Sequence, residues 1–223
     1  MKTPVSLALA ILSAALLAGC GSIVGSFIQP QTIDNPANLK GQVLSTSSPL
    51  RALTVAGTVA YSTASTGGFD DYQYPGNVPF NIRPHAVSLS ASFAGATVGG
   101  PCAFHDSFDV TLQKFSVAVW ERAKPGARAE LSAEPKVTLH FTRTDSGPTS
   151  ATYAAAANSV TLSGGAGVTD PAIDVLTTHD AANDNSKNDA SVKAEITADQ
   201  DGLAGCNVAF KLGKASLTLS DFH

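Results

Sequence analysis

The sequence predicts an all-β protein, built as an antiparallel β-sandwich or Greek-key-like domain of roughly nine to eleven strands. Apolar and polar residues alternate with a period of two in one short stretch after another, the pattern of half-buried strands. The breaks between these stretches are too short to hold a crossover helix, so neighbouring strands should run antiparallel. Charged residues make up only 14% of the chain, and Ser, Thr, Asn and Gly supply most of the polar content, as in secreted β-proteins.

The first clear strand is expected at residues 53–61, where Leu53, Val55 and Tyr61 share one face. The single helix candidate is residues 152–158, where alanines cluster, although a helix of that length is not stable alone. Further strands are expected at residues 87–93, 108–112, 115–119, 137–141, 159–163, 173–176, 191–197 and 207–219.

Near the C-terminus the apolar residues switch from even to odd positions at Gly213-Lys214, a change of apolar parity. A β-hairpin with a type II′ turn explains the change and would pair Phe210 with Leu217. We therefore predict a hairpin here, and the alternative is one long strand with a bulge at the same place. The same change of parity at Gln113-Lys114 comes without a glycine, which favours a bulge there.

The first twenty residues form a separate segment. Residues 5–18 carry no charge and follow Lys2, and this run of 14 residues is shorter than the roughly 20 that a membrane-spanning helix needs. The pattern therefore predicts a secretory signal peptide. The motif Leu17-Ala18-Gly19-Cys20, which closes the run, resembles the lipobox of bacterial lipoproteins. This resemblance implies cleavage before Cys20 and attachment of acyl chains, palmitate among them, to that cysteine.

This interpretation divides the chain into a signal peptide (1–19), a lipidated tether (20–40) and a single β-sandwich domain (41–223). Lipid on Cys20 would attach the domain to a membrane of the bacterial cell envelope. Gly21 is not the aspartate that favours inner-membrane retention in lipoproteins of enteric-type bacteria, so the outer membrane is expected. Loss of Lys2 with the signal peptide leaves 13 basic against 18 acidic residues, a formal charge of −5, which argues against nucleic acid as a partner.

With Cys20 assigned to lipid, Cys102 and Cys206 are the cysteines that remain. The envelope outside the inner membrane is oxidising, so we expect them to form a disulfide. A metal or catalytic role is the alternative, but neither lies in a C-x-x-C motif or at ligand spacing from a histidine.

Residues 65–84 hold several prolines and glycines and predict a long loop. Loops of this length inside compact domains are more often functional than not. This one carries four aromatic residues, which either fold back over the core or bind a partner protein or glycan. They are Phe69, Tyr72, Tyr74 and Phe80.

Eight of the 18 acidic residues lie between Asp170 and Asp201. A solvated acidic loop is one explanation. The other is calcium as a cofactor, because four oxygen-bearing side chains fall at positions 1, 3, 5 and 12 of a loop like that of the EF-hand. Against a true EF-hand, Asp189 occupies position 6, where that loop needs glycine. The four residues are Asp184, Ser186, Asn188 and Glu195.

The sequence carries no strong catalytic signature. It contains no G-x-S-x-G motif, and its five histidines lack the H-x-H and H-E-x-x-H spacings of metal sites. We therefore expect a binding or structural module, such as an accessory subunit of a larger envelope assembly. An envelope hydrolase with a dispersed active site is the alternative, because a Ser-His-Asp triad is defined by geometry and not by spacing.

Overall fold

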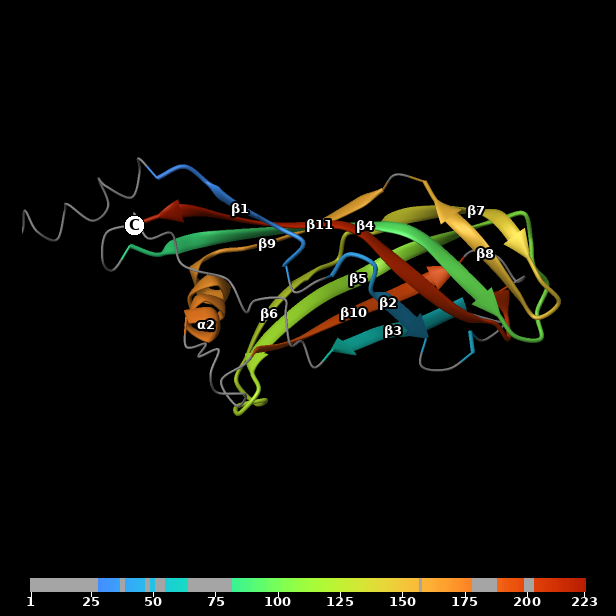
Figure 1. The fold of residues 1–223 in the computed structure, drawn as a ribbon, viewed down its shortest axis with the longest axis horizontal. Coiled ribbons are helices and arrows are strands. Elements are labelled where there is room, and N and C mark those ends of the chain that lie inside the picture. Colours follow the sequence, from blue (N-terminus) through green and yellow to red (C-terminus); the bar gives the residue numbers. More distant parts are fainter. Residues whose placement is uncertain are drawn as a thin grey trace, which may run out of the picture.

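The computed structural model describes residues 28–36, 39–46, 49–50, 55–63, 82–156, 158–177, 188–198 and 203–223. Within these residues, eleven strands form one sheet, and every strand pair in it is antiparallel. The predicted all-β antiparallel fold is confirmed (Figure 1). The elements are β1 (Gln31–Asp34), β2 (Val43–Thr46), β3 (Val55–Thr63), β4 (Pro84–Gly99), β5 (Ser107–Glu121), β6 (Arg128–Ala133), β7 (Val137–Ser146), β8 (Ser150–Ala155), β9 (Ser159–Gly164), α2 (Ala166–Thr177), β10 (Asn188–Ala198) and β11 (Asn207–Phe222).

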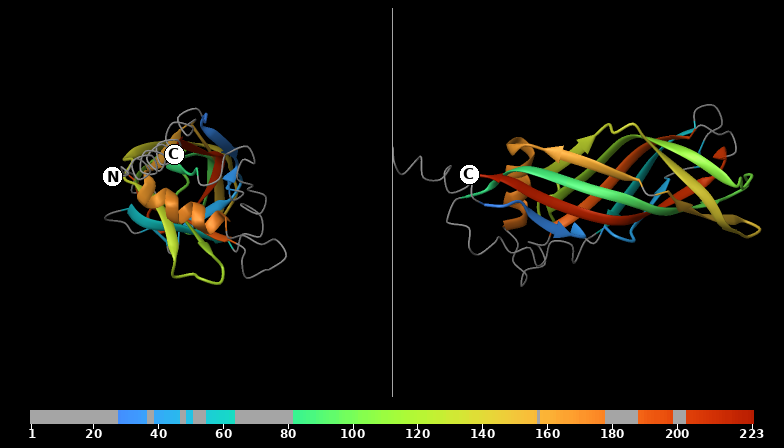
Figure 2. Two further views of the ribbon diagram at one scale, coloured as in Figure 1. Left: turned by 90° about the vertical axis from the view of Figure 1, so that its left-hand side faces the viewer. Right: turned by 90° about the horizontal axis from the view of Figure 1, so that it is seen from above.

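The sheet curls on itself. Its strand order is β1-β11-β2-β3-β10-β5-β7-β8-β4-β9, with β6 attached to β5, and an additional pairing joins β11 to β4. The long strands β4 and β5 change partners halfway: β4 pairs first with β9 and then with β8, while β5 pairs first with β7 and then with β6. At one end, β6 and β9 lie close without pairing, and α2 packs against both (Figure 1). Seen from that end, α2 lies across the opening of the curled sheet (Figure 2).

The concave side of the sheet holds the core, because one alternate set of side chains along each strand faces inward. Its largest members are aromatic rings in mutual contact, such as Phe93 edge-on to Phe115 with centroids 6.2 Å apart, and Phe108 stacked on Phe141 at 4.9 Å. These rings come from β4, β5 and β7, so the aromatic cluster joins strands that are far apart in the sequence.

Two predicted elements are wrong in type. Residues 173–176, expected as a strand, belong to helix α2, in which Thr169 and Ile173 are buried one turn apart. The Thr169 backbone N–H and hydroxyl both donate to the Gly165 carbonyl at 3.1 Å, which stabilises the first turn. Residues 152–158, expected as a helix, lie largely in strand β8, which pairs with β4 and β7. Two neighbouring strands supply backbone hydrogen bonds that outweigh the helix propensity of alanine.

The predicted hairpin at Gly213-Lys214 is also wrong, and the bulge alternative is confirmed. Residues 207–222 form one strand that pairs with β4 along its length. Leu212 lies opposite Phe93 and Ala215 opposite Ala91, so the two residues between them face Ser92 alone. A bulge at Gln113 is confirmed in the same way, because Leu112 and Lys114 lie opposite consecutive residues of β10.

Strand β1 falls within residues 20–40, the range expected as a tether, and it pairs with β11. Strand β6 was not predicted, because its alternation is weak: Ala129 is buried, while Leu131 is half-buried. In the described part of the chain, no helix is long and apolar enough to cross a membrane.

Candidate functional site

A polar groove of about 580 Å³ lies on the outer face of the sheet, where β1, β11, β4 and β9 run side by side. Outward-facing hydroxyl groups form its floor, and two lysines and one aspartate are its charged residues. This volume is within the range of about 300–1,000 Å³ that is usual for small-molecule sites. The groove is lined by Asp34, Asn35, Lys40, Ser90, Ser92, Ser159, Lys214, Ala215 and Ser216.

The register of the strands explains the hydroxyl floor. Ser90 of β4 lies between Ser216 of β11 and Thr161 of β9, and Ser92 lies beside Ser159. Side chains of directly paired residues point to the same face. The inward neighbours Leu89, Ala91 and Phe93 fill the core, so the alternation that builds the core also builds the groove.

The bulge in β11 places a lysine in the groove. Ser92 Oγ accepts a hydrogen bond of 2.7 Å from the Lys214 backbone N–H and donates one of 3.1 Å to the Lys214 carbonyl. A Cβ atom at Gly213 would lie 2.6 Å from Ser92 Oγ, so the close approach requires glycine. Because of the extra residue, alternate side chains of β11 again face the core beyond the bulge. The same residue leaves Lys214 exposed among the serines.

A short connection between β1 and β2 carries the second lysine. Asn35 has a positive φ of 50°, its N–H donates to the Ala215 carbonyl at 2.9 Å, and its side-chain oxygen accepts from the Lys40 N–H at 2.7 Å. Gly41 donates to the Leu212 carbonyl at 2.9 Å. These bonds fasten the connection to β11 on both sides of the bulge and hold Lys40 at the groove.

Charge in the groove is unbalanced. Among the described residues, the ammonium groups of Lys40 and Lys214 make no ion pair or hydrogen bond. Asp34 is the one acidic residue of the lining. The groove therefore carries excess positive charge on a protein that is acidic as a whole.

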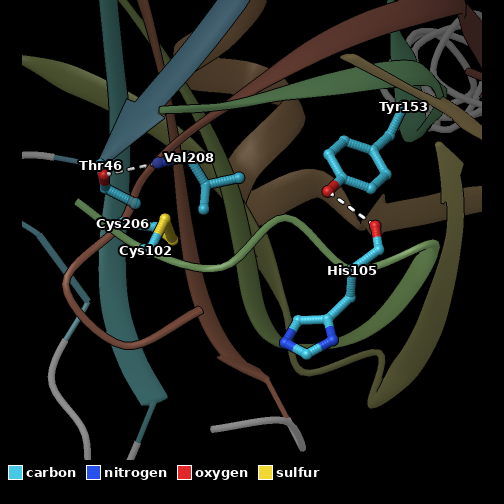
Figure 3. Close-up of a disulfide and its surroundings, with 6 residues drawn as sticks. All are labelled: Thr46, Cys102, His105, Tyr153, Cys206 and Val208. Atoms are coloured by element: carbon cyan, nitrogen blue, oxygen red, sulfur yellow. Dashed lines mark hydrogen bonds between the residues drawn. A yellow bond between two sulfur atoms is a disulfide. The ribbon is translucent and has the colours of Figure 1, made fainter. Parts of the chain in front are cut away.

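The predicted disulfide is confirmed. Cys102 and Cys206 are bonded, with Cα atoms 5.6 Å apart and a sequence separation of 104 (Figure 3). The bond fastens the β4–β5 connection to the start of β11. Cys206 is fully buried, and beside it Thr46 Oγ1 accepts a hydrogen bond of 3.2 Å from the Val208 N–H.

Close to the disulfide, Tyr153 is buried and its hydroxyl donates to the His105 carbonyl at 3.0 Å (Figure 3). Burial raises the pKa of this phenol, the nearby Arg143 guanidinium opposes the shift, and Asp106 adds to it. Arg143 itself donates to the Phe104 carbonyl and pairs with Asp106. This network holds the 101–106 connection in place.

Most of the other predicted site residues lie outside the described part of the chain. These are Cys20, the aromatic set Phe69, Tyr72, Tyr74 and Phe80, and two of the four calcium candidates, Asp184 and Ser186.

The other calcium candidates, Asn188 and Glu195, lie seven residues apart on the extended strand β10, a separation of about 23 Å. Strand β10 therefore does not by itself bring these two positions together, and the calcium hypothesis stays a prediction. Glu195 instead lies beside Lys193 and Lys114 on the outer face of the sheet. In the described residues, no group of three or more His, Cys, Asp and Glu side chains could hold a metal ion.

Three of the four described histidines, His85, His140 and His223, have ring contacts that bear on the hydrolase alternative. His140 is exposed, as the alternation predicts, and its Nδ1 lies 2.5 Å from a carboxylate oxygen of Asp109. His85 stacks on His223 with centroids 3.8 Å apart. No serine hydroxyl bonds to any of these three rings in the described part of the chain, so the Ser-His contact of a triad is not formed there.

The structure shows an all-β domain with a polar groove on its outer face. Comparison of the chain with known proteins does not assign it to a family. No family model and no curated protein matches the chain. A structure of infectious bursal disease virus, Gx strain, aligns with 86% of this chain at 11% identity and a TM-score of 0.28, and this chain spans 34% of that one.

Two further solved structures are similar over most of their length. A lipoprotein from Bacteroides thetaiotaomicron is 10% identical, with 86% of this chain and 84% of that chain covered and a TM-score of 0.21. The CBM2 module of an evolved Dit protein from Lactobacillus casei phage J-1 is 6% identical, with coverages of 87% and 98% and a TM-score of 0.21. Scores this low carry no argument about function.

No local sequence pattern marks the groove. Its serines belong to three strands, and its lysines lie in a bulge and a loop, so no local motif joins them. The parity change at Gly213-Lys214 was the available signal, because bulges often redirect a side chain at functional sites.

Proposed function

We propose that this protein is a lipid-anchored protein of the bacterial cell envelope, most readily of the outer membrane, and that it works as a binding module for an acidic glycan. The anchor is Cys20 of the Leu17-Ala18-Gly19-Cys20 motif. The Cys102–Cys206 disulfide supports an oxidising compartment, in which such bonds persist.

The observation that carries the binding proposal is the pair of unpartnered ammonium groups, Lys40 and Lys214, above a floor of serine hydroxyls. Ammonium groups attract carboxylate or sulfate groups of a glycan, and serine hydroxyls donate and accept hydrogen bonds with sugar hydroxyls. The described residues of the lining include no aromatic ring on which a neutral sugar could stack, so we expect charge to supply much of the affinity.

Calorimetric titration with oligogalacturonate, and with uncharged dextran oligosaccharide of similar length, tests the binding proposal. We expect heat with the acidic oligosaccharide alone, and loss of at least about tenfold in affinity, or 1.4 kcal/mol, for K40Q/K214Q. K136Q is the matched control, because Lys136 is an exposed lysine in the β6–β7 turn. Equal binding of both oligosaccharides, or equal loss in the control, would contradict the proposal.

The anchor needs its own test. In cells fed a clickable palmitate analogue, the wild-type protein should carry the label in the membrane fraction and the Cys20→Ala variant should not. Separation of inner and outer membranes then reports the destination. Label on the variant, or an unlabelled wild type, would rule out lipid on this cysteine.

A further inference from the structure

A second cavity lies inside the curled sheet, beneath α2, and is separate from the polar groove. It has a volume of about 50 Å³, and the surface that it presents is entirely apolar. Its walls come from both halves of the sheet, through Val87 and Leu89 of β4, Val117 and Val119 of β5, and Leu217 and Leu219 of β11.

Helix α2 closes this cavity. Thr169, Ala172 and Ile173 face it, and Thr169 and Ile173 are each only 1% exposed. The Thr169 hydroxyl donates to the Gly165 carbonyl at 3.1 Å, so its polar group is satisfied within the helix. A cavity without polar partners does not hold ordered water and favours apolar ligands.

Helix α2 depends on its packing against the sheet for its stability. At 12 residues, with Gly167 and Pro171 inside it, it is too short and too poor in helix-forming residues to be stable without packing. One exposed ion pair, Arg83 with Asp174 at 2.6 Å, is among the contacts that hold it, and exposed pairs of this kind are weak. The half-buried His85 ring lies 3.8 Å from Oδ1 of Asp170, a buried oxygen without a hydrogen-bond partner among the described residues.

The end of the domain that carries the cavity is also the end at which the chain enters. Gln31, the first residue of β1, pairs with Leu219, which lines the cavity, and the start of β1 lies at the α2 end of the molecule (Figure 1). Cys20 precedes the described residue Ile28 by eight positions, a reach of at most about 28 Å. This step rests on the proposed anchor, which would keep this end of the domain close to the bilayer.

We propose that the cavity binds one acyl chain of a membrane phospholipid, inserted from the bilayer beneath α2. The closed cavity is smaller than the roughly 150 Å³ that takes a benzene molecule, so the chain enters with an outward shift of α2. A bilayer phospholipid is the occupant because withdrawing one of the protein's own acyl chains would weaken its hold on the membrane.

Photo-crosslinking in cells tests this site in the full-length protein. Cells take up a palmitate analogue with a terminal diazirine, are irradiated, and the purified protein is digested and analysed by mass spectrometry. We expect cross-links in the peptides of β4, β5, β11 and α2 that line the cavity. Cross-links confined to peptides outside this lining would overturn the proposal.

Three variants sharpen the result. Ala172→Phe fills the cavity and should lower this labelling about fivefold, whereas the matched control Ala154→Phe, at an exposed position of β8, should leave it unchanged. Asp174→Asn removes the exposed ion pair with Arg83, so it should loosen α2 and raise the labelling. This variant keeps the test decisive if Ala172→Phe folds poorly. Unchanged labelling in both Ala172→Phe and Asp174→Asn would refute the site.

The Cys20→Ala variant decides the source of the acyl chain. Its signal peptide is not cleaved and still holds the protein at the membrane. Persistent cavity labelling in this variant supports a bilayer lipid, and its loss would assign the occupant to the protein's own anchor and overturn the proposal. Lipid on Cys20 is read separately from the peptide that contains it. A failure of the anchor and a failure of the cavity are therefore distinct results.

Discussion

The bulge in β11 allows us to predict how much stability the protein loses when Gly213 is replaced by alanine. The residue has no positive φ, so its requirement for glycine comes from the 2.6 Å approach of an added Cβ to Ser92 Oγ. Gly213→Ala must displace that hydroxyl and break its two hydrogen bonds to Lys214. At about 1 kcal/mol for each bond, the loss is about 2 kcal/mol, or about 4–8 °C in melting temperature for a chain of this size.

A double-mutant cycle separates this cause from any other. Ser92→Ala removes the same two hydrogen bonds and should also cost about 2 kcal/mol. In the Ser92→Ala background the hydroxyl is gone, so Gly213→Ala should cost nothing further, and the coupling energy should equal about 2 kcal/mol. Urea unfolding followed by fluorescence of Trp120, the sole tryptophan, provides the measurement.

Gly126→Ala is the matched control, because an added Cβ at Gly126 meets nothing within 4 Å. We expect a change of less than about 0.5 kcal/mol there. If the Gly213 and Ser92 substitutions prove additive, the hydrogen bonds to Ser92 are not the reason for glycine at this position, and the explanation of the bulge given above is wrong.

Three further predictions concern stability. Tyr153→Phe should lower the free energy of unfolding by about 1 kcal/mol at pH 7, because it removes the hydrogen bond to His105. Burial raises the pKa of Tyr153 above its ordinary 10.0, so the wild type should lose this advantage as the pH rises above 10.0. The urea midpoints of the two proteins should therefore differ at pH 8 and move together at pH 11. Cys102→Ser with Cys206→Ser opens a loop of 104 residues and should cost about 2–5 kcal/mol by urea unfolding, with no added effect of reductant on the variant. Gly95→Ala places a Cβ atom 2.3 Å from the Tyr153 carbonyl oxygen, a backbone atom that cannot rotate away, and calorimetry should show a loss of more than about 3 kcal/mol, larger than for Gly213→Ala.

Local pattern was sufficient for part of this molecule. Period-two alternation identified the strands around Leu89, Val110, Leu139 and Val192, because a sheet with one face on the core forces apolar residues to alternate. Cysteine count and compartment were sufficient for the Cys102–Cys206 disulfide.

Where two explanations fitted one pattern, the partner strand decided. The parity change at Gly213 fits a hairpin and a bulge equally, and β4 selects the bulge by offering partners on both sides of it. The alanines of residues 151–155 favour a helix alone, but β4 and β7 supply backbone partners for a strand. Residues 173–176 alternate like a strand, but the packing of Thr169 and Ile173 over the cavity favours a helix.

The groove and the cavity depend on tertiary structure altogether. Lys40 and Lys214 are 174 positions apart in the sequence and meet at one groove because β1, β11 and β4 are neighbours in the curled sheet. The apolar cavity likewise needs β4, β5, β11 and α2 together. A sequence pattern records which face of an element is apolar, but it contains no record of which elements become neighbours. Composition and periodicity therefore determined the all-β class. The closing of the sheet decided where the groove and the cavity lie.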